Sequence, residues 1–285
     1  MMAALPPYAT PLERIWHYSY RILCALVFIF LIGPILVIIP LSFNAEPYFT
    51  FTQEMLSLDP AGYSLRWYED FFTSQAWLAS IGNSFVIGIA STALSTVLGT
   101  LAALGLSRSQ MPFRSLIMSI LISPMIVPLI ISAAGMFFFY SSVQLSQTFI
   151  GVILAHTALG TPFVVITVTA TLSGFDQTLT RASASLGASP TYTFFNVILP
   201  LVTPGVISGA LFAFITSFDE VVVVIFVAGV EQRTIPLQMW GGIREQISPT
   251  ILAVATILVC ISIGLLTVME LLRRRNERLR GLSPG

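Results

Sequence analysis

The sequence predicts an all-α membrane protein with six transmembrane helices, both termini in the cytoplasm and a short cytoplasmic helix between spans four and five. Two observations carry this prediction. First, 55% of the 285 residues are hydrophobic and only 9% are charged, with a mean hydropathy of +0.88, whereas a soluble domain has roughly 25% charged residues. Second, the arginines cluster in segments that a six-span path places on one side of the bilayer.

Six stretches are long and apolar enough to cross a bilayer, which takes about 20 residues in an α-helix. They lie at roughly 21–41, 77–106, 113–140, 149–172, 204–229 and 249–272. The first occupies the position of a signal peptide. However, its apolar run exceeds the usual length of about 7–15 residues, and no small-residue cleavage pattern follows it. We therefore expect it to be retained as a membrane helix.

Several spans carry residues that predict a packed bundle rather than isolated lipid-facing helices. Pro124 and Pro128 interrupt the third span, and Pro162 interrupts the fourth beside Gly160. Neighbouring helices must satisfy the backbone groups that such breaks leave free. Small residues permit close approach between helices, and the second span has four glycines, Gly82, Gly88, Gly99 and Gly105.

Arginine placement predicts the orientation. The arginines before the first span and after the second, fourth and sixth all fall on one side, which the positive-inside rule assigns to the cytoplasm. They are Arg14, Arg21, Arg108, Arg114, Arg181, Arg273, Arg274, Arg275, Arg278 and Arg280. We thus expect one transmembrane domain over 1–285. Its non-spanning parts are a cytoplasmic segment 1–20, an external loop 42–76, a cytoplasmic loop 171–203 and a cytoplasmic tail 273–285.

Composition excludes several classes of function. All thirteen basic residues are arginine, so the lysine of a phosphate-binding GxxxxGK[ST] loop cannot be supplied and the chain is not its own P-loop ATPase. A net charge of zero gives no case for nucleic acid. No HExxH, GxSxG or CxxC pattern predicts a catalytic or metal site, and Cys24 and Cys260 lie in apolar runs, where packing is expected.

The cytoplasmic loop contains a helical segment interrupted by glycine and proline, residues 176–200, which we call the elbow. Asp176 is a good N-cap for a helix over 177–186, and Gly187 suits the left-handed position that ends a helix. Ser189 then caps a second helix with Pro190 at its first position, where the missing N–H costs nothing. The elbow is therefore expected to form two helices joined at a glycine.

The second elbow helix covers about nine residues, "PTYTFFNVI". Leu199 precedes Pro200 and is biased toward extended geometry, so we expect the helix to stop there. A helix this short is marginal in water. Its aromatic side chains Tyr192, Phe194 and Phe195 should be covered by the bundle, by a partner or by both.

The elbow resembles the cytoplasmic loop of binding-protein-dependent ABC transporter permeases. That family's pattern is Glu-Ala-Ala, three residues, Gly, nine residues and Ile-x-Leu-Pro. Here Gly187 is followed by nine residues and by Val197, Leu199 and Pro200. Ala182 matches the first alanine of the pattern. Two positions depart from it, since Arg181 replaces the glutamate and Ser183 replaces the second alanine.

Further segments resemble the polyamine-type branch of that family, and in particular its second permease subunit. They are "SFN" at 42–44, "SLRWYEDFF" at 64–72, "SFDE" at 217–220, "RTIPLQMW" at 233–240 and "ISP" at 247–249. The branch also includes importers of opines and other small nitrogenous solutes. The resemblance implies a multi-pass subunit in a bacterial inner membrane that takes up an amine-bearing solute and is not itself an enzyme.

The resemblance also implies partners: a related permease in a heterodimer, two ATPase subunits that bind ATP and Mg, and an external substrate-binding protein. This chain would bind no cofactor or metal. The loop of the family inserts its short helix into the ATPase. The implied contact residues are Arg181, Ala182, Ser183, Gly187, Ser189, Pro190, Tyr192, Phe194, Phe195, Leu199 and Pro200. The alternative is a solvated loop that only packs on the bundle.

Asp219 and Glu220 lie inside the fifth predicted span, ahead of four valines. Carboxylates within a membrane are costly and usually face a cavity or a partner. One hypothesis is that at least one lines the translocation pathway and attracts a cationic solute, with Trp240 of the external link 230–248 near its mouth. The alternative is a structural hydrogen bond or an ion pair with the partner permease.

Three other features have simpler interpretations. In the loop 42–76, Leu65, Tyr68 and Phe72 share a helical face, which favours an interfacial anchor over docking of the binding protein. His156 favours bundle packing with one hydrogen bond over a proton relay. The terminal "RRRNERLR" favours an anchor beside anionic membrane lipid over a nucleic-acid patch.

The sequence leaves two rival functions open. An ion-gradient-driven secondary carrier would act without an ATPase partner, but the spans offer no mid-membrane acidic ligand beyond Asp219 and Glu220, and the elbow would be unexplained. A structural or receptor-like membrane protein is the third possibility, and absence of solute flux would distinguish it.

Overall fold

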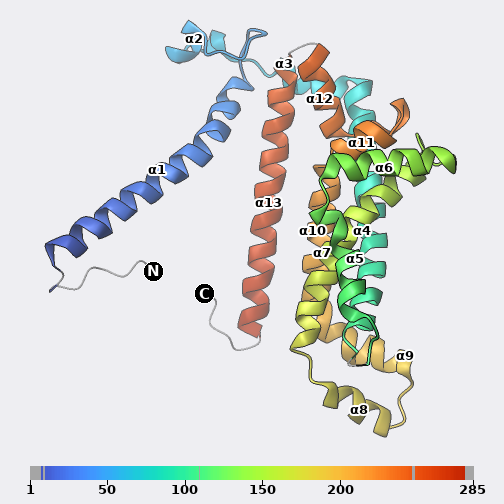
Figure 1. Cartoon of the computed structure of the whole chain (residues 1–285). Helices are drawn as coiled ribbons and strands as arrows, with labels where there is room; N and C mark the ends of the chain where they lie inside the picture. The colour runs from blue at the N-terminus through green and yellow to red at the C-terminus, as the bar shows by residue number, and fades with distance from the viewer. Residues whose placement is uncertain (1–7, 9, 109, 246–247, 280–285) are drawn as a thin grey trace. The chain divides into compact units, whose positions relative to one another are not determined.

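The computed structural model describes residues 8, 10–108, 110–245 and 248–279 (Figure 1). Every regular element among these residues is a helix, and one isolated β-bridge joins Asn44 to Tyr63. The all-α prediction is confirmed. Parts of the predicted segment 1–20 and of the predicted tail 273–285, including Arg280, lie outside the described residues, as does Ile247.

The chain divides into two compact units, residues 1–74 with 242–285 and residues 75–241. The first unit contains α1 (Pro11–Leu41), α2 (Gln53–Leu56), the 3₁₀-helix η1 (Pro60–Gly62), α3 (Arg66–Thr73) and α13 (Thr250–Leu279). A capping box in which Thr10 and Glu13 bond each other's backbone N–H groups begins α1. This helix therefore starts at Pro11, well before the predicted span near residue 21.

Side-chain bonds order the segment that follows α1. Tyr68 Oη and Ser42 Oγ are 2.7 Å apart, and Trp67 Nε1 donates to the Asn44 carbonyl at 2.7 Å. Thr250 Oγ1 at the start of α13 donates to Asp70 Oδ2 at 2.8 Å. The buried aromatic of α3 is Phe71, whereas Leu65 and Phe72 of the predicted face are more than half exposed. The predicted loop is thus an ordered cap on α13.

The second unit contains the remaining elements. They are α4 (Gln75–Leu106), α5 (Arg114–Ile126), α6 (Leu129–Ser142), α7 (Phe149–Ser173), α8 (Gln177–Ser185), α9 (Pro190–Thr193), the π-helix η2 (Phe194–Ile198), α10 (Leu199–Phe218), α11 (Val222–Val227), the 3₁₀-helix η3 (Val230–Gln232) and α12 (Ile235–Glu245), whose last residues are counted with the first unit.

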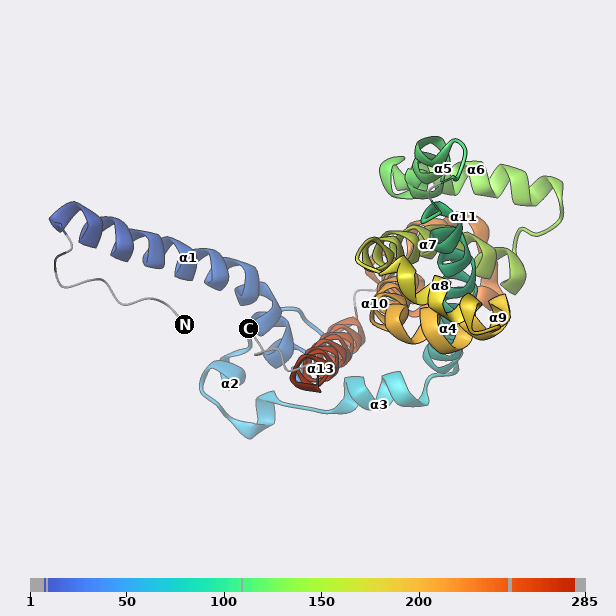
Figure 2. The same cartoon turned by 90° about the horizontal axis from the view of Figure 1, so that it is seen from below.

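The helices α4, α7 and α10 pack on one another and form the centre of this unit (Figure 2). Their approach is close enough to require glycine, because a Cβ added at Gly99 would lie 2.6 Å from Val164 Cβ. A polar chain also crosses the three helices: His156 Nδ1 and Ser217 Oγ are 2.7 Å apart, and Ser91 Oγ donates to Ser217 Oγ at 3.0 Å. The predicted single hydrogen bond of the buried His156 is confirmed.

Among the described residues, length and composition identify four helices that could each cross a membrane, or up to five if a bent pair counts as one span. The four contain α1, α4, α7 and the continuous helix Pro190–Phe218. The bent pair is α5 and α6, which meet at 103° beside Pro128, where the sequence predicts an interruption. In α13, the stretch Thr250–Gly264 counts only as a shorter apolar helix.

Two predictions about the fifth span are wrong. The chain does not leave the helix before Pro200, because Leu199 has helical angles of φ −57° and ψ −45°. Nor is 204–229 one helix, because α10 ends at Phe218 and α11 begins at Val222. A wide π turn over Phe194–Ile198, in which Leu199 N–H donates to the Phe194 carbonyl, lets the helix pass the proline that lacks an N–H.

Candidate functional site

The first helix of the elbow begins at a side-chain cap. Thr178 N–H donates to Asp176 Oδ1 at 2.9 Å, as expected for an aspartate at the N-cap. This bond holds the pKa of the Asp176 carboxyl below its ordinary value. The helix α8 then runs from Gln177 to Ser185, one residue short of the prediction.

The turn between α8 and α9 is a complete Schellman motif around Gly187. Gly187 has φ +80°, its N–H donates to the Ala184 carbonyl at 3.0 Å, and Ala188 N–H donates to the Ser183 carbonyl at 3.1 Å. This pair of bonds satisfies the carbonyls at the end of a helix. The predicted left-handed glycine is confirmed.

The second helix begins as predicted and is bonded to the first. Tyr192 N–H donates to Ser189 Oγ at 3.2 Å, and Pro190 occupies the first turn. Ser183 Oγ and Thr193 Oγ1, both buried, are 2.8 Å apart and link α8 to α9. The departure from alanine at Ser183 therefore has a structural role: its hydroxyl joins the two helices.

The aromatic residues of the elbow divide between two surroundings. Tyr192 and Phe195 are each 58% exposed, and Leu186 at the turn is 88% exposed. Phe194 is partly buried and lines a groove instead. The bundle therefore covers only part of the apolar surface of the elbow, and a partner must cover the rest if it is to leave water.

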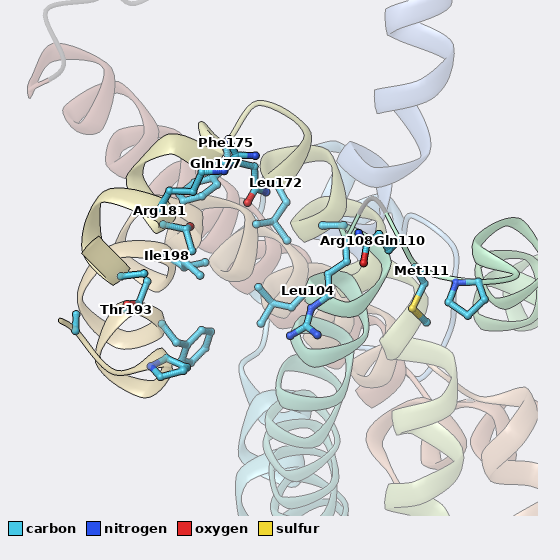
Figure 3. Close-up of a pocket in the computed structure, with 17 residues that line it drawn as sticks. Leu104, Arg108, Gln110, Met111, Leu172, Phe175, Gln177, Arg181, Thr193 and Ile198 are labelled. Carbon is cyan, nitrogen blue, oxygen red and sulfur yellow. The ribbon is translucent and has the colours of Figure 1, made fainter. Parts of the chain in front are cut away.

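The groove has a volume of about 890 Å³ and lies within the second unit. One wall is the elbow, including Arg181, Thr193 and Ile198, and the facing wall comprises the end of α4 and the residues after it, including Leu104, Arg108 and Met111 (Figure 3). The elbow and the segment after α4, residues 107–108 and 110–113, which we call the α4 link, thus form one concave surface.

The predicted carboxylate pair lies at the break between α10 and α11. Asp219 follows the last residue of α10 and is exposed. Glu220 is 8% exposed, and its Oε1 accepts the N–H of Val223 at 2.8 Å in the first turn of α11. The Glu220 side chain therefore has the structural hydrogen bond that the sequence offered as an alternative.

Trp240 lies on α12 and is 48% exposed. The start of this helix is bonded to α4 by side chains that the sequence analysis did not single out. Asn83 Nδ2 donates to the carbonyls of Glu231 and Arg233 at 2.7 and 3.0 Å, and Ile235 N–H donates to Ser84 Oγ at 2.8 Å. Their spacing could have indicated a polar contact face on α4, since Ser84, Ser91 and Ser95 fall on one face of a helix.

The family of the chain follows from comparison with known proteins. A family model described as "Binding-protein-dependent transport system inner membrane component" matches residues 95–278. The chain belongs to this family. It is a permease subunit of an ABC importer in the inner membrane, it is not an enzyme, and the ion-gradient alternative is disfavoured.

Individual relatives support the same assignment. The permease is 31% identical over 251 residues to the spermidine/putrescine transport system permease protein PotC of Haemophilus influenzae, covering 88% of this chain and 95% of the relative. It is 27% identical to the putrescine transport system permease protein PotI of Escherichia coli K12, covering 93% and 95%. The resemblance to polyamine-type permeases is thereby confirmed.

One solved structure confirms the fold. A chain from the crystal structure of a bacterial ABC transporter involved in the import of the acidic polysaccharide alginate matches with a TM-score of 0.69. The match covers 94% of the permease and 99% of that chain at 15% identity. At this identity the likeness concerns the fold alone.

Proposed function

We propose that the permease is the second membrane subunit of a polyamine-type importer, with six spans and both termini in the cytoplasm. The bent pair α5–α6 forms the third span, and α13 forms the sixth. Its partners are a related permease in a heterodimer, two ATPase subunits that bind ATP and Mg, and an external substrate-binding protein. The arginine distribution and the relatives support this arrangement.

The observation that carries the coupling part of the proposal is the geometry of the elbow. It is a capped helix pair, held by Gly187 and by the Ser183–Thr193 bond, that leaves Tyr192 and Phe195 exposed. A surface of this kind fits a cleft on the ATPase. Because the helix continues from Pro190 to Phe218, movement of the elbow reaches the α10–α11 break without crossing a loop.

The solute is proposed to be a small polyamine. The names of the relatives at 27–31% identity support this class. The carboxylates Asp219 and Glu220 suit a cation, since intramembrane acids commonly mark solute pathways. A relative of another kind, a probable molybdenum ABC transporter permease protein of Haloferax volcanii, is 28% identical over 70% of this chain, so the class needs a direct test.

The test is uptake by the complete importer in liposomes. We expect ATP-dependent uptake of spermidine or putrescine in the presence of the binding protein, and none of molybdate. Uptake by the permease alone, without an ATPase subunit, would contradict the assignment of partners. Molybdate uptake without polyamine uptake would contradict the proposed solute while leaving the coupling proposal intact.

The pathway role of the carboxylates is tested by Asp219→Asn and Glu220→Gln. Glutamine retains an oxygen that can accept the Val223 N–H, so the Glu220→Gln variant removes the charge and keeps the cap. We expect at least one variant to assemble normally and to raise the KM for polyamine. Unchanged KM in both would leave Glu220 with a structural role only.

A further inference from the structure

The groove between the elbow and the α4 link is lined by two arginines and, among the described residues, by no carboxylate. Arg181 projects from α8 on one wall and Arg108 follows α4 on the other. Within the described residues, neither guanidinium takes part in a hydrogen bond or an ion pair, and the described lining includes no acidic side chain.

The acidic residue closest to Arg181 in the elbow sequence has another role. Asp176 accepts the N–H of Thr178 and caps α8. It attracts Arg181 electrostatically without forming an ion pair with it, and it does not line the groove. Arginine binds carboxylates in a fork geometry that pairs two N–H donors with two oxygens. Two guanidinia on facing walls of one groove therefore favour a carboxylate as the occupant.

The surroundings of the groove favour a protein as the source of that carboxylate. Its lining includes four apolar side chains, Leu104, Leu172, Phe175 and Ile198, which suit the aliphatic stem of a side chain. The groove also adjoins the exposed apolar surface of the elbow at Leu186, Tyr192 and Phe195. An apolar patch beside a charged groove has the composition of a protein interface.

We propose that the ATPase subunit places an acidic side chain, aspartate or glutamate, in this groove, where it pairs with Arg181 and Arg108. The inference rests on the proposed docking of the elbow and adds a second contact, through the α4 link. It also reverses the charge at the position where the family's pattern has glutamate. The permease supplies the cation there and the ATPase supplies the anion.

The first experiment measures retention of the ATPase subunits by the purified importer in lipid nanodiscs over a series of salt concentrations. Arg181→Glu, which introduces the family's residue, and Arg108→Glu should each weaken the association about tenfold or more, because a like charge then faces the acid. Arg181→Lys keeps the charge but loses the fork geometry, so it should weaken the association less than Arg181→Glu does. Arg114→Glu is the matched control: Arg114 is exposed at the start of α5 and does not line the groove, so the substitution should change little.

The second experiment uses the absence of lysine from the sequence. Arg181→Lys and Arg108→Lys each introduce the only side-chain amine of the permease, which a carbodiimide can join to a neighbouring carboxylate. We expect an isopeptide bond from each substituted position to one Asp or Glu of the ATPase, identified by mass spectrometry. Arg114→Lys should give none.

The outcomes separate this inference from the docking proposal. If the unmodified permease retains no ATPase, both are wrong. If it retains ATPase equally well with Arg181→Glu and Arg108→Glu, and no cross-link forms, docking stands and the acidic anchor is wrong. If these variants instead lose co-purifying anionic lipid while ATPase binding is unchanged, the groove binds a lipid headgroup and the inference is overturned.

Discussion

The elbow and the α10–α11 break are both places where one helix ends and another begins within a few residues, yet they are stabilised differently. In the elbow, Asp176, Gly187 and Ser189 satisfy the helix ends with exposed local groups. At the break, the start of α11 depends on the buried carboxylate of Glu220. Local residue types determine the first, and burial determines the second.

The two regions should respond differently to substitution. A cap in water competes with solvent, and its loss typically costs about 1 kcal/mol. A buried N–H that loses its acceptor cannot bond to water instead, so its loss lowers the free energy of unfolding by more, about 1–3 kcal/mol. The break should therefore be the more sensitive region to one substitution, and the elbow should tolerate several.

The largest effect is expected at Glu220. Glu220→Leu leaves the buried N–H of Val223 without its acceptor, which should lower the free energy of unfolding by about 1–3 kcal/mol. The measurement is thermal unfolding of the solubilised importer, followed by tryptophan fluorescence. Glu220→Gln is the control that keeps an acceptor and should lose much less. Equal stability of the leucine and glutamine variants would contradict a capping role.

The next effect is expected at Gly187. With φ +80° and no atom within 4 Å of an added Cβ, Gly187→Ala meets no steric obstacle beyond its own backbone. The left-handed conformation should still cost about 1–2 kcal/mol for a residue with a side chain. Hydrogen exchange at the amides of Gly187 and Ala188 should rise accordingly.

Gly174→Ala is the matched control for Gly187. Gly174 has φ −93°, and its added Cβ would lie 3.8 Å from the Thr171 carbonyl oxygen, an ordinary contact. It should therefore leave exchange in the elbow unchanged. Equal effects at the two glycines would show that the left-handed turn does not hold the elbow together.

These two regions also show what the sequence can and cannot predict. The elbow caps follow from residue type and spacing, and so do the glycine turn and the start at Pro190. The prediction that the second elbow helix ends before Pro200 was wrong, because a π turn lets the helix continue past a residue without an N–H. No residue pattern in the sequence predicts that turn. The break at Asp219 was missed because the following valines read as a continuing apolar helix.

The sequence also did not predict which polar side chains of different helices bond to one another. Ser91 and Ser217 are distant in sequence, and only packing of α4 on α10 brings them to His156. The groove is similar, since Arg108 and Arg181 were predicted only to share one side of the membrane. Side-chain type predicts that a polar residue needs a partner, but the tertiary fold selects which one.

A smaller effect is expected from the bond that joins the elbow helices. Ser183→Ala leaves the buried hydroxyl of Thr193 without a partner and should destabilise the α8–α9 contact by about 1 kcal/mol. Adding Thr193→Val removes that hydroxyl and should restore much of the loss. Hydrogen exchange across α8 and α9 in both single variants and the double variant measures the coupling. Additive losses would contradict a direct bond.

The smallest effect is the pH dependence of the α8 cap. Because the N–H of Thr178 lowers the pKa of Asp176, the folded elbow binds this proton less readily than the unfolded chain. The contribution of the charged Asp176 cap to the stability of α8 is fully present above the ordinary aspartate pKa and is lost as the pH falls below about 4. Exchange in α8 should accelerate over that range beyond its intrinsic change. Asp176→Asn caps equally well without titrating, so its exchange should show no such step. A step that persists in the asparagine variant would assign the pH dependence to another group.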